Sequence, residues 1–417
     1  MDMNETELEQ PKPKSGFAGG FFCGVAGMLV VVCVAAGVLF GTNTICIADK
    51  QEDESGILTD AVTAKVDRLV GEISQYYYED VETSELVDGL YKGLFASLGD
   101  PYSQYYTPEE YEDIKISASA KYYGIGAALQ QDKETKKVTV AKVYEGSGAE
   151  AAGLKRGDEV VSVEGMTATE EELSDLVATI RGEEGTTVHI EVIREGEEEQ
   201  LAFDVERGEV HIPTVASKML EDGVGYIQVS EFAESTPKEF QSAINTLTEQ
   251  GMKAMMVDLR GNGGGVLTAC QKMLDMILPE GVVVYTEDKY GNREDYKSDA
   301  EHSMQLPIVV LVNGNSASAS EIFAGAIHDF EYGTLIGTKT FGKGIVQNVK
   351  MLPDGSAYKL TVSKYYTPNG HNIHGTGIEP DIEVEYEYSG DAAAEEYDEL
   401  LDSQVLKGLE VLKEQLK

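Results

Sequence analysis

Residues 307–330, PIVVLVNGNSASASEIFAGAIHDF, join two apolar runs through a polar loop. The first run, 307–312, is short, uncharged and rich in β-branched residues, which predicts a buried strand. The second, EIFAGAIHDF, predicts a helix. Between them Ser316, Ser318 and Ser320 alternate with alanines. A strand that runs through a short loop into a helix is the repeating unit of a layered α/β fold.

The same order of parts occurs upstream. A strand is predicted over 254–259, then comes RGNGGG at 260–265, then a helix is predicted over 266–278. Helix amino ends carry free N–H groups and a positive dipole, which suit a developing oxyanion. Two such junctions can bring two sets of donors to one edge of a sheet. We therefore predict one α/β core over 209–388.

Two further regions precede the core. Apolar residues at three- and four-residue spacing predict helices over 56–117. Over 118–208 the pattern changes to short alternating runs and turns with one helix, TATEEELSDLVATIRG, for which Thr169 and Glu172 form a predicted capping box. This order of parts resembles a PDZ domain, in which a loop of backbone N–H groups binds a terminal carboxylate and the next strand pairs with the peptide.

The predicted loop of this PDZ domain is the sequence GIG. An alternative is that its glycines only make a bend and that the domain binds nothing. The predicted peptide-binding residues of the loop and helix are Gly124, Ile125, Gly126, Leu173 and Val177.

The segment 15–48 contains no charged side chain, and its most apolar part is long enough for a membrane-spanning helix. Lys12 and Lys14 flank its amino end, so residues 1–14 are predicted to stay in the cytoplasm, with the catalytic part extracytoplasmic. The alternative is a cleaved signal peptide, for which the small residues near Ala48 offer a cut site. At the other end, 389–417 predicts an acidic amphipathic helix or helix pair. It packs on its own core or on a second subunit, so a homodimer or higher homo-oligomer stays open.

Composition limits the possible partners. The formal net charge of −41 argues against nucleic acid, because phosphate binding needs clustered Lys and Arg. The four cysteines have no disulfide or zinc spacing. We therefore predict neither a metal nor an organic cofactor.

The glycine-rich loops fit neither nucleotide motif. The 260–265 loop continues with Val266 where a dinucleotide fingerprint needs its last glycine. The sequence GTKTFGKG at 337–344 has Gly344 where a phosphate-binding loop needs Ser or Thr, and a strand is predicted after it. None of the six histidines lies in a recognisable triad context. Lys343, in a nearly uncharged run, is the other possible base for a serine nucleophile.

Five motifs together resemble the carboxyl-terminal processing peptidases, the tail-specific serine proteases of family S41. These are SLGDPYSQYYTPEEYEDI, DLRGNGGG, NGNSASASEIFAGAIHDF, GTKTFGKGIVQ and YYTPNGHNIHGTGIEPDI. The likeness covers residues 56–385. It implies an α/β (α+β overall) fold, with a crotonase- or ClpP-like layered peptidase core, N-terminal helices and an inserted PDZ domain.

The resemblance also implies the site residues. The middle serine, Ser318, corresponds to the nucleophile, Lys343 to the base, and Gln347 to the glutamine that follows it. The implied oxyanion donors are the backbone N–H groups of Gly264 and Ala319. The sequence departs from the family's pattern at two positions: Gly263 stands where proline is common, and His371 where arginine is frequent. The first departure could loosen the oxyanion loop.

The chemistry agrees with these assignments. A serine hydroxyl needs a neighbouring base, and lysine serves only when neutral. Its pKa of about 10.4 must fall by roughly three units, which burial among apolar groups can provide. Gln347 lies four residues later, so on a strand it would face the same side as Lys343. The alternative is that Ser318 and Glu321 form only a helix capping box.

These observations predict a membrane-anchored, extracytoplasmic serine endopeptidase. It captures C-terminal tails of protein or peptide substrates in its PDZ domain, cuts them by a Ser–Lys dyad, and is gated by that domain. The alternative is a noncatalytic membrane scaffold that binds C-termini.

Overall fold

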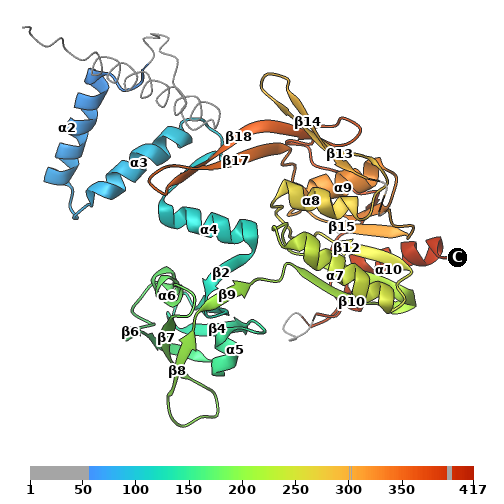
Figure 1. Cartoon of the computed structure of the whole chain (residues 1–417), viewed down its shortest axis with the longest axis horizontal. Helices are drawn as coiled ribbons and strands as arrows, with labels where there is room; N and C mark the ends of the chain where they lie inside the picture. Colours follow the sequence, from blue (N-terminus) through green and yellow to red (C-terminus); the bar gives the residue numbers. More distant parts are fainter. Residues whose placement is uncertain (1–55, 300, 302, 392–396) are drawn as a thin grey trace, which may run out of the picture. The chain divides into compact units, whose positions relative to one another are not determined.

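The computed structural model describes residues 56–299, 301, 303–391 and 397–417. These residues belong to two compact units that divide after Glu82 (Figure 1). The predicted cytoplasmic N-terminus and the predicted membrane segment lie outside the described residues. Among the described residues, no helix has the length and apolarity that a membrane span requires.

Helix α2 (Asp60–Tyr76) is the regular element of the first unit. The Thr59 hydroxyl caps it by accepting the backbone N–H of Val62. The predicted apolar stripe is present, but Leu69 and Ile73 on it are exposed. Among the described residues of this unit, the stripe therefore forms no buried core.

The second unit begins with elements that lead to the PDZ domain: α3 (Thr83–Ala96), β1 (Gln104–Tyr106) and α4 (Pro108–Ser119). The α4 capping box is complete, because Glu110 accepts the N–H of Thr107 at 2.9 Å while the Thr107 hydroxyl accepts that of Glu110 at 3.3 Å. The helix start predicted from Thr-Pro-Glu-Glu is thus confirmed.

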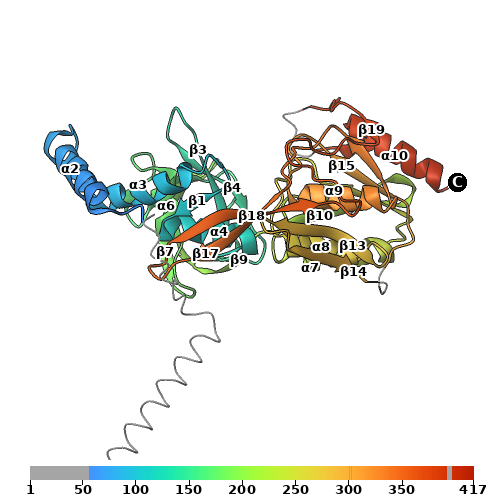
Figure 2. The same ribbon diagram turned by 90° about the horizontal axis from the view of Figure 1, so that it is seen from above.

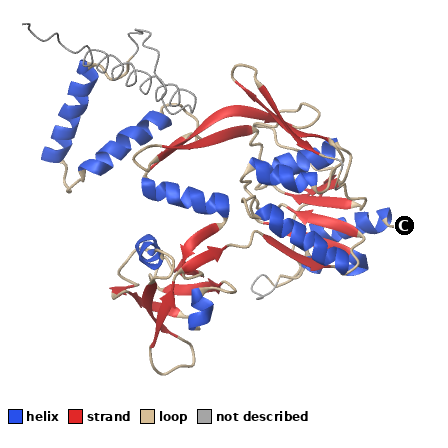
Figure 3. Cartoon of the chain, in the orientation of Figure 1, coloured by secondary structure: helices blue, strands red, loops and turns tan. Residues whose placement is uncertain are grey.

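The predicted PDZ domain is rich in strands and has two short helices, as Figure 3 shows. Its elements are β2 (Lys121–Gly124), β3 (Ala127–Gln131), β4 (Val138–Val143), α5 (Gly148–Ala152), β5 (Glu159–Val163), β6 (Met166–Thr167), α6 (Leu173–Ile180), β7 (Thr187–Ile193), β8 (Leu201–Glu206) and β9 (Gly208–His211). The sheet order is β3-β4-β5-β7-β8, with β6 on β5, while β2 pairs with β9. The predicted capping box is wrong: α6 begins only at Leu173, and its N-cap Glu172 makes no side-chain cap bond. Three non-helical residues lie between Thr169 and the first residue of α6, so the Thr169 hydroxyl is too far from the helix start to cap it.

The predicted peptidase core contains the remaining elements. They are β10 (Val215–Met219), η1 (Glu221–Gly223), β11 (Val224–Val229), α7 (Thr236–Glu249), β12 (Ala254–Asp258), α8 (Leu267–Asp275), β13 (Gly281–Asp288), β14 (Arg293–Ser298), β15 (Ile308–Val312), α9 (Ala319–Asp329), β16 (Thr334–Gly337), β17 (Ile345–Met351), β18 (Ala357–Tyr366), β19 (Ile382–Glu383), η2 (Glu399–Leu401) and α10 (Ser403–Gln415). Both predicted strand–loop–helix junctions are present.

The central sheet has the order β10-β11-β12-β15-β16-β19, and its strands are parallel except for the antiparallel β10–β11 pair. Because successive strand residues face opposite sides, each strand contributes to two cores. Met255 and Val310 pack with α7, α8 and α9, whereas Met256 and Val309 pack with α10. Figure 2 shows α10 on one side of the sheet and α7 and α8 on the other. The core is therefore a three-layer α/β/α arrangement.

A second sheet has the order β1-β18-β13-β14, with β17 paired to β18. Strand β18 pairs with β17 along most of its length, with β1 near its start and with β13 near its end. The β17–β18 ribbon extends from the core (Figure 1). It connects the loop of Lys343, which precedes β17, with the segment that enters β1.

The C-terminal segment packs on its own core. Val405, Leu409 and Leu412 of α10 are buried against the central sheet. Asp402 caps α10 by accepting the N–H of Gln404 at 2.7 Å. Of the two predicted arrangements, packing on its own core or on a second subunit, the structure shows the first.

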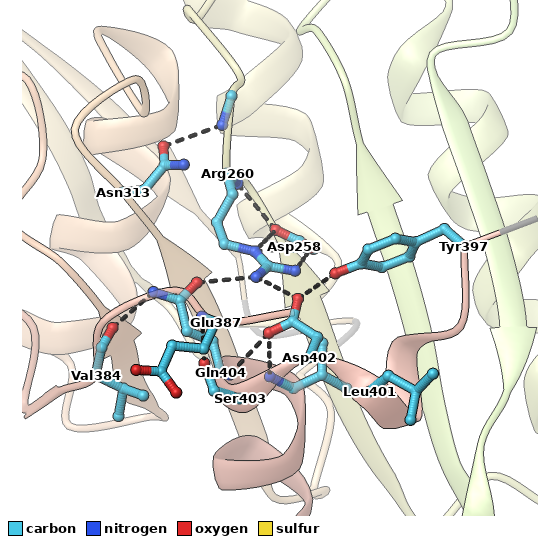
Figure 4. A network of polar contacts seen from close by, with 12 residues as sticks. Asp258, Arg260, Asn313, Val384, Glu387, Tyr397, Leu401, Asp402, Ser403 and Gln404 are labelled. Atoms are coloured by element: carbon cyan, nitrogen blue, oxygen red, sulfur yellow. Dashed lines mark hydrogen bonds and ion pairs between the residues drawn. The ribbon is translucent and has the colours of Figure 1, made fainter. Parts of the chain in front are cut away.

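A buried charged network holds this segment beside the glycine loop (Figure 4). The guanidinium of Arg260 lies 2.6 Å from an Asp258 oxygen and 2.7 Å from an Asp402 oxygen. It also donates to the Gln404 amide oxygen at 2.8 Å, and Tyr226 donates to Asp258 at 2.6 Å. Arg260 directly precedes the 261–265 loop, so the end of the chain is tied to the base of that loop.

Candidate active site

The two strand–loop–helix junctions meet at one edge of the central sheet. The carbonyl of Asn262 accepts the N–H of Ala317 at 3.0 Å and the hydroxyl of Ser320 at 2.9 Å. Gly264 packs directly on the serine loop: a Cβ at this residue would lie 2.7 Å from the Ser318 Cβ. Since Gly264 also has φ +107°, only glycine fits this contact without strain.

Ser318 differs from its two neighbouring serines. Ser316 is buried, and its hydroxyl donates to the carbonyl of Leu259 at 2.8 Å. Ser320 is buried as well and bonds the glycine loop. Ser318 is the N-cap of α9, with φ 54° and ψ −114°, and lines a cavity of about 470 Å³. A positive φ in a residue with a side chain is a strained conformation that surrounding contacts must hold in place.

Glu321 supplies those contacts. Its side chain is fully buried, and its Oε2 accepts the backbone N–H of Ser318 at 2.9 Å and that of Lys343 at 2.8 Å. Its Oε1 accepts the N–H of Gly342 at 2.7 Å and the hydroxyl of Thr340 at 2.6 Å. One carboxylate thus joins the start of α9 to the loop before β17. Sequence reasoning saw Glu321 only as half of a capping box.

Tyr365 on β18 reinforces the same junction. Its hydroxyl donates toward the carbonyl oxygen of Ser318 at 3.1 Å and that of Lys343 at 2.5 Å. Burial raises the pKa of this phenol well above its ordinary value, so it stays a hydrogen-bond donor. The sequence offered no signal for this role, because the pairing of β17 with β18 sets it.

Lys343 is half-buried and lines the same cavity as Ser318. Burial lowers the pKa of its ammonium, and the nearby Lys359 lowers it further, while Asp100 and Glu321 act in the opposite direction. The Nζ atom lies 4.5 Å from the centre of the Tyr102 ring. In the described part of the chain, no hydrogen bond joins this amine to the Ser318 hydroxyl.

Gln347 also lines the cavity, but not because it alternates with Lys343 along one strand, as predicted. Lys343 precedes β17, and the pairing of β17 with β18 shifts between Val346 and Gln347, so a simple two-residue period does not relate the two side chains. The Gln347 amide donates to the Thr361 hydroxyl at 3.3 Å.

Gly264, one of the two predicted oxyanion donors, already has a hydrogen-bond partner. The N–H of Gly264 donates to the buried Asn262 side-chain oxygen at 2.8 Å, and the Asn262 amide in turn donates to the carbonyl of Val229 at 2.9 Å. Ala319 directly follows Ser318, the predicted nucleophile, and lines the same cavity as Gly263. A Cβ on Gly263 would meet nothing within 4 Å, so the space would accept the family's proline.

The predicted peptide-binding residues of the PDZ domain lie in its glycine loop and on α6. Ile125 is a core residue, exposed by only 1%, so of this residue only the backbone is available to a ligand. Gly124 and Gly126 flank it, directly before β3, an edge strand that pairs only with β4 in its sheet and contacts α6. On α6, Leu173 and Val177 are partly exposed, whereas Leu176 is fully buried.

The described residues contain no group of three or more His, Cys, Asp or Glu side chains that could hold a metal ion. Cys270 is a buried free thiol. Its sulfur donates to the carbonyl of Ala319 at 3.2 Å.

Comparison with known proteins identifies the family of this chain. A profile of peptidase family S41 matches residues 223–384, a PDZ-domain profile matches 124–205, and one described as the activating protease CtpB N-terminal domain matches 24–110. The chain is 36% identical to the carboxy-terminal processing protease CtpA of Bacillus subtilis (strain 168), over 86% of this chain and 76% of that protein. The chain belongs to peptidase family S41.

Two further processing proteases are similar to this chain. Carboxy-terminal processing protease CtpB of Bacillus subtilis (strain 168) is 34% identical over 78% of this chain and 68% of its own length. The solved photosystem II D1 C-terminal processing protease is 29% identical, with a TM-score of 0.45 over 76% of this chain and 86% of that chain. The resemblance inferred from the five motifs is confirmed. This protein is a serine peptidase with a mixed α/β S41 fold and a PDZ domain, and its substrates are peptides or proteins.

Proposed function

We propose that Ser318 is the nucleophile and Lys343 the general base of this S41 peptidase, and that peptide bonds are cut through an acyl-enzyme. One observation carries the proposal: Ser318 and Lys343 line the same cavity while a single buried carboxylate, Glu321, binds the backbone of both. Such a link fixes the distance between a nucleophile and a base that lie 25 positions apart in the sequence.

The chemical steps follow from these positions. The neutral Lys343 amine takes the hydroxyl proton of Ser318 as Oγ attacks the scissile carbonyl carbon. The ammonium then gives that proton to the departing amine, leaving an ester on Ser318. A water molecule, deprotonated by Lys343, hydrolyses the ester. The N–H groups of Ala319 and Gly264 stabilise the oxyanion, the latter once it exchanges Asn262 for the substrate oxygen.

We further propose that the PDZ domain captures the free C-terminus of the substrate. The edge strand β3 has unpaired backbone groups toward α6, which suits an added peptide strand. The backbone at Gly124 and Gly126 would receive the carboxylate, with Leu173 and Val177 beside the last side chains. Amidation of the substrate's C-terminus is expected to raise KM at least tenfold. Equal KM for the acid and the amide would contradict this assignment.

The proposed location is the cell membrane, with one N-terminal anchor and the catalytic part extracytoplasmic. The uncharged segment 15–48 and the lysines before it support this proposal. In intact cells, an externally added protease should reach a tag at the C-terminus. Protection of that tag, with cleavage only after lysis, would refute the orientation.

The direct test of the dyad uses the full-length chain in mild detergent, with Ser318→Ala and Lys343→Ala variants beside it. An unstructured protein with an apolar C-terminal tail is the substrate, and mass spectrometry follows the fragments. We expect both variants to fold and neither to cut. Cutting that survives Ser318→Ala would overturn the assignment, and tail binding without cutting by the unmodified chain would favour the scaffold hypothesis.

A further inference from the structure

A tyrosine that the mechanism above does not use lies directly under the proposed base. Tyr102 belongs to the turn between α3 and β1, and the Lys343 Nζ is 4.5 Å from the centre of its ring. This distance is within the range of a cation–π interaction, in which the negative face of the ring attracts a cation. The contact joins residues far apart in the sequence, so it depends on the tertiary fold.

The turn that holds Tyr102 is itself anchored. The carboxylate of Asp100 accepts the Tyr102 N–H at 3.0 Å and the Ser103 hydroxyl at 2.6 Å. The Ser103 hydroxyl accepts the N–H of Thr361 on β18 at 3.0 Å. Since β17 pairs with β18, the segment that carries Tyr102 and the loop that carries Lys343 both connect to the same sheet. A ring fixed in this way is preorganised rather than placed by a flexible loop.

Besides the Tyr102 ring, three charged side chains act on the Lys343 ammonium. Lys359 on β18 repels its ammonium, while Asp100 beside the ring and Glu321 on α9 attract it. Glu321, however, is occupied by four donors from the nucleophile and base loops. Among the ion pairs of the described residues, none has Lys343 as a partner. The Tyr102 face is therefore the group in contact with the ammonium.

We propose that Tyr102 is a positioning residue of the peptidase reaction, whose ring face stabilises the ammonium that forms when Lys343 takes the proton from Ser318. The inference rests on the proposed Ser318–Lys343 dyad. In a Ser–His–Asp triad a buried carboxylate stabilises the protonated base. Here the face of the Tyr102 ring stabilises the protonated base instead. A carboxylate in contact with the amine would stabilise its charged form too strongly for it to act as a base near neutral pH, whereas a ring attracts a cation more weakly.

Two measurable consequences follow from this role. Removing the ring face takes attraction away from the ammonium, so the pKa of Lys343 in the free enzyme falls and the acidic limb of kcat/KM moves to lower pH. A cation–π contact of ordinary strength corresponds to a shift of about 0.4 to 1.5 pH units. The same loss is felt by the ammonium in the transition state, so the plateau of kcat/KM above the limb falls by up to roughly 30-fold.

The experiment compares the unmodified full-length chain with Tyr102→Leu and Tyr102→Phe. The substrate is an internally quenched peptide with a free apolar C-terminus, assayed from acidic to alkaline pH. Phenylalanine keeps the ring face without the hydroxyl, so we expect Tyr102→Phe to retain the unmodified profile. Tyr111→Leu is the matched control, because its ring lies 5.2 Å from the Nζ of Lys115 on α4, away from the dyad.

The expected result is a lower plateau together with an acidic limb at lower pH for Tyr102→Leu alone. Equal impairment of the Phe and Leu variants, or a lower plateau with an unmoved limb, would mean a merely structural role and overturn the proposal. A plateau that rises would also overturn it, since the ring would then only restrain the resting lysine. Lys343→Ala is run in parallel: if it still cuts, the dyad itself fails, whereas a dead Lys343→Ala beside an unchanged Tyr102→Leu refutes the role of Tyr102 alone.

Discussion

Replacing Glu321 by glutamine tests whether one buried carboxylate holds the site together. The substitution keeps the shape of the side chain but turns one acceptor oxygen into an NH2 donor. Whichever oxygen is replaced, two donors lose their acceptor: either the N–H groups of Ser318 and Lys343, or the N–H of Gly342 and the hydroxyl of Thr340. Two buried hydrogen bonds to a charged group at roughly 1.5–3 kcal/mol each give a loss of about 3–6 kcal/mol.

Part of this loss should appear as lost activity, because either pair of donors lies in the loops that carry the dyad. We expect Glu321→Gln to unfold at lower urea concentration and to lose at least about 100-fold in kcat, since misplacement of a catalytic group by about 1 Å has that order of effect. Urea unfolding followed by circular dichroism gives the first quantity, and the quenched-peptide assay gives the second.

Glu110 provides a matched control for this substitution. It also occupies the third position of a capping box, but its side chain is 44% exposed and its partners are the Thr107 N–H and Lys92. Glu110→Gln should therefore cost no more than about 1 kcal/mol. If Glu321→Gln is as mild as this control in both stability and kcat, the carboxylate does not organise the dyad and the reasoning is wrong.

Three further outcomes can be measured with the same assays. Because burial lowers the pKa of Lys343, and only the neutral amine acts as a base, kcat/KM should rise with pH through a midpoint below 10.5; a midpoint at or above that value would contradict the burial argument. Gly264→Ala should abolish cutting, since its Cβ would lie 2.7 Å from that of Ser318; full activity would show that the loop yields freely. Asp402→Ala leaves Arg260 with one buried carboxylate fewer and should cost about 3–5 kcal/mol in urea unfolding, whereas a change below about 1 kcal/mol would show that the network does not hold the C-terminal segment.

The sequence predicted the parts of the site that depend on local pattern. An apolar run followed by alternating small residues was enough to place Ser318 at the start of a helix. The RGNGGG loop at 260–265 was recognisable in the same way, because it follows a predicted strand and precedes a predicted helix. The helix start at Thr107 was equally local, since its capping box lies within four residues. Each of these features is decided by residues that are near one another in the chain.

Features that depend on distant residues were missed. Tyr102 lay inside a quoted motif but received no role, because nothing near it in the chain shows that Lys343 will lie above its ring. Glu321 looked like an ordinary cap, since its bonds to Gly342 and Lys343 arise only when the loop before β17 reaches α9. The predicted capping box at Thr169 failed for a local reason instead, because α6 begins only at Leu173.

In the resting site, the N–H of Gly264, a proposed oxyanion donor, is bonded to the side chain of Asn262. Breaking this hydrogen bond costs on the order of 1 kcal/mol until a substrate oxygen takes the place of Asn262. A substrate that offers its carbonyl oxygen to the Gly264 N–H competes directly with Asn262, so binding energy from the rest of the peptide can be used to form the oxyanion hole. Short peptides that occupy only the cavity should therefore be cut with a lower kcat than long ones, because they supply less of that energy at the step where the loop must change.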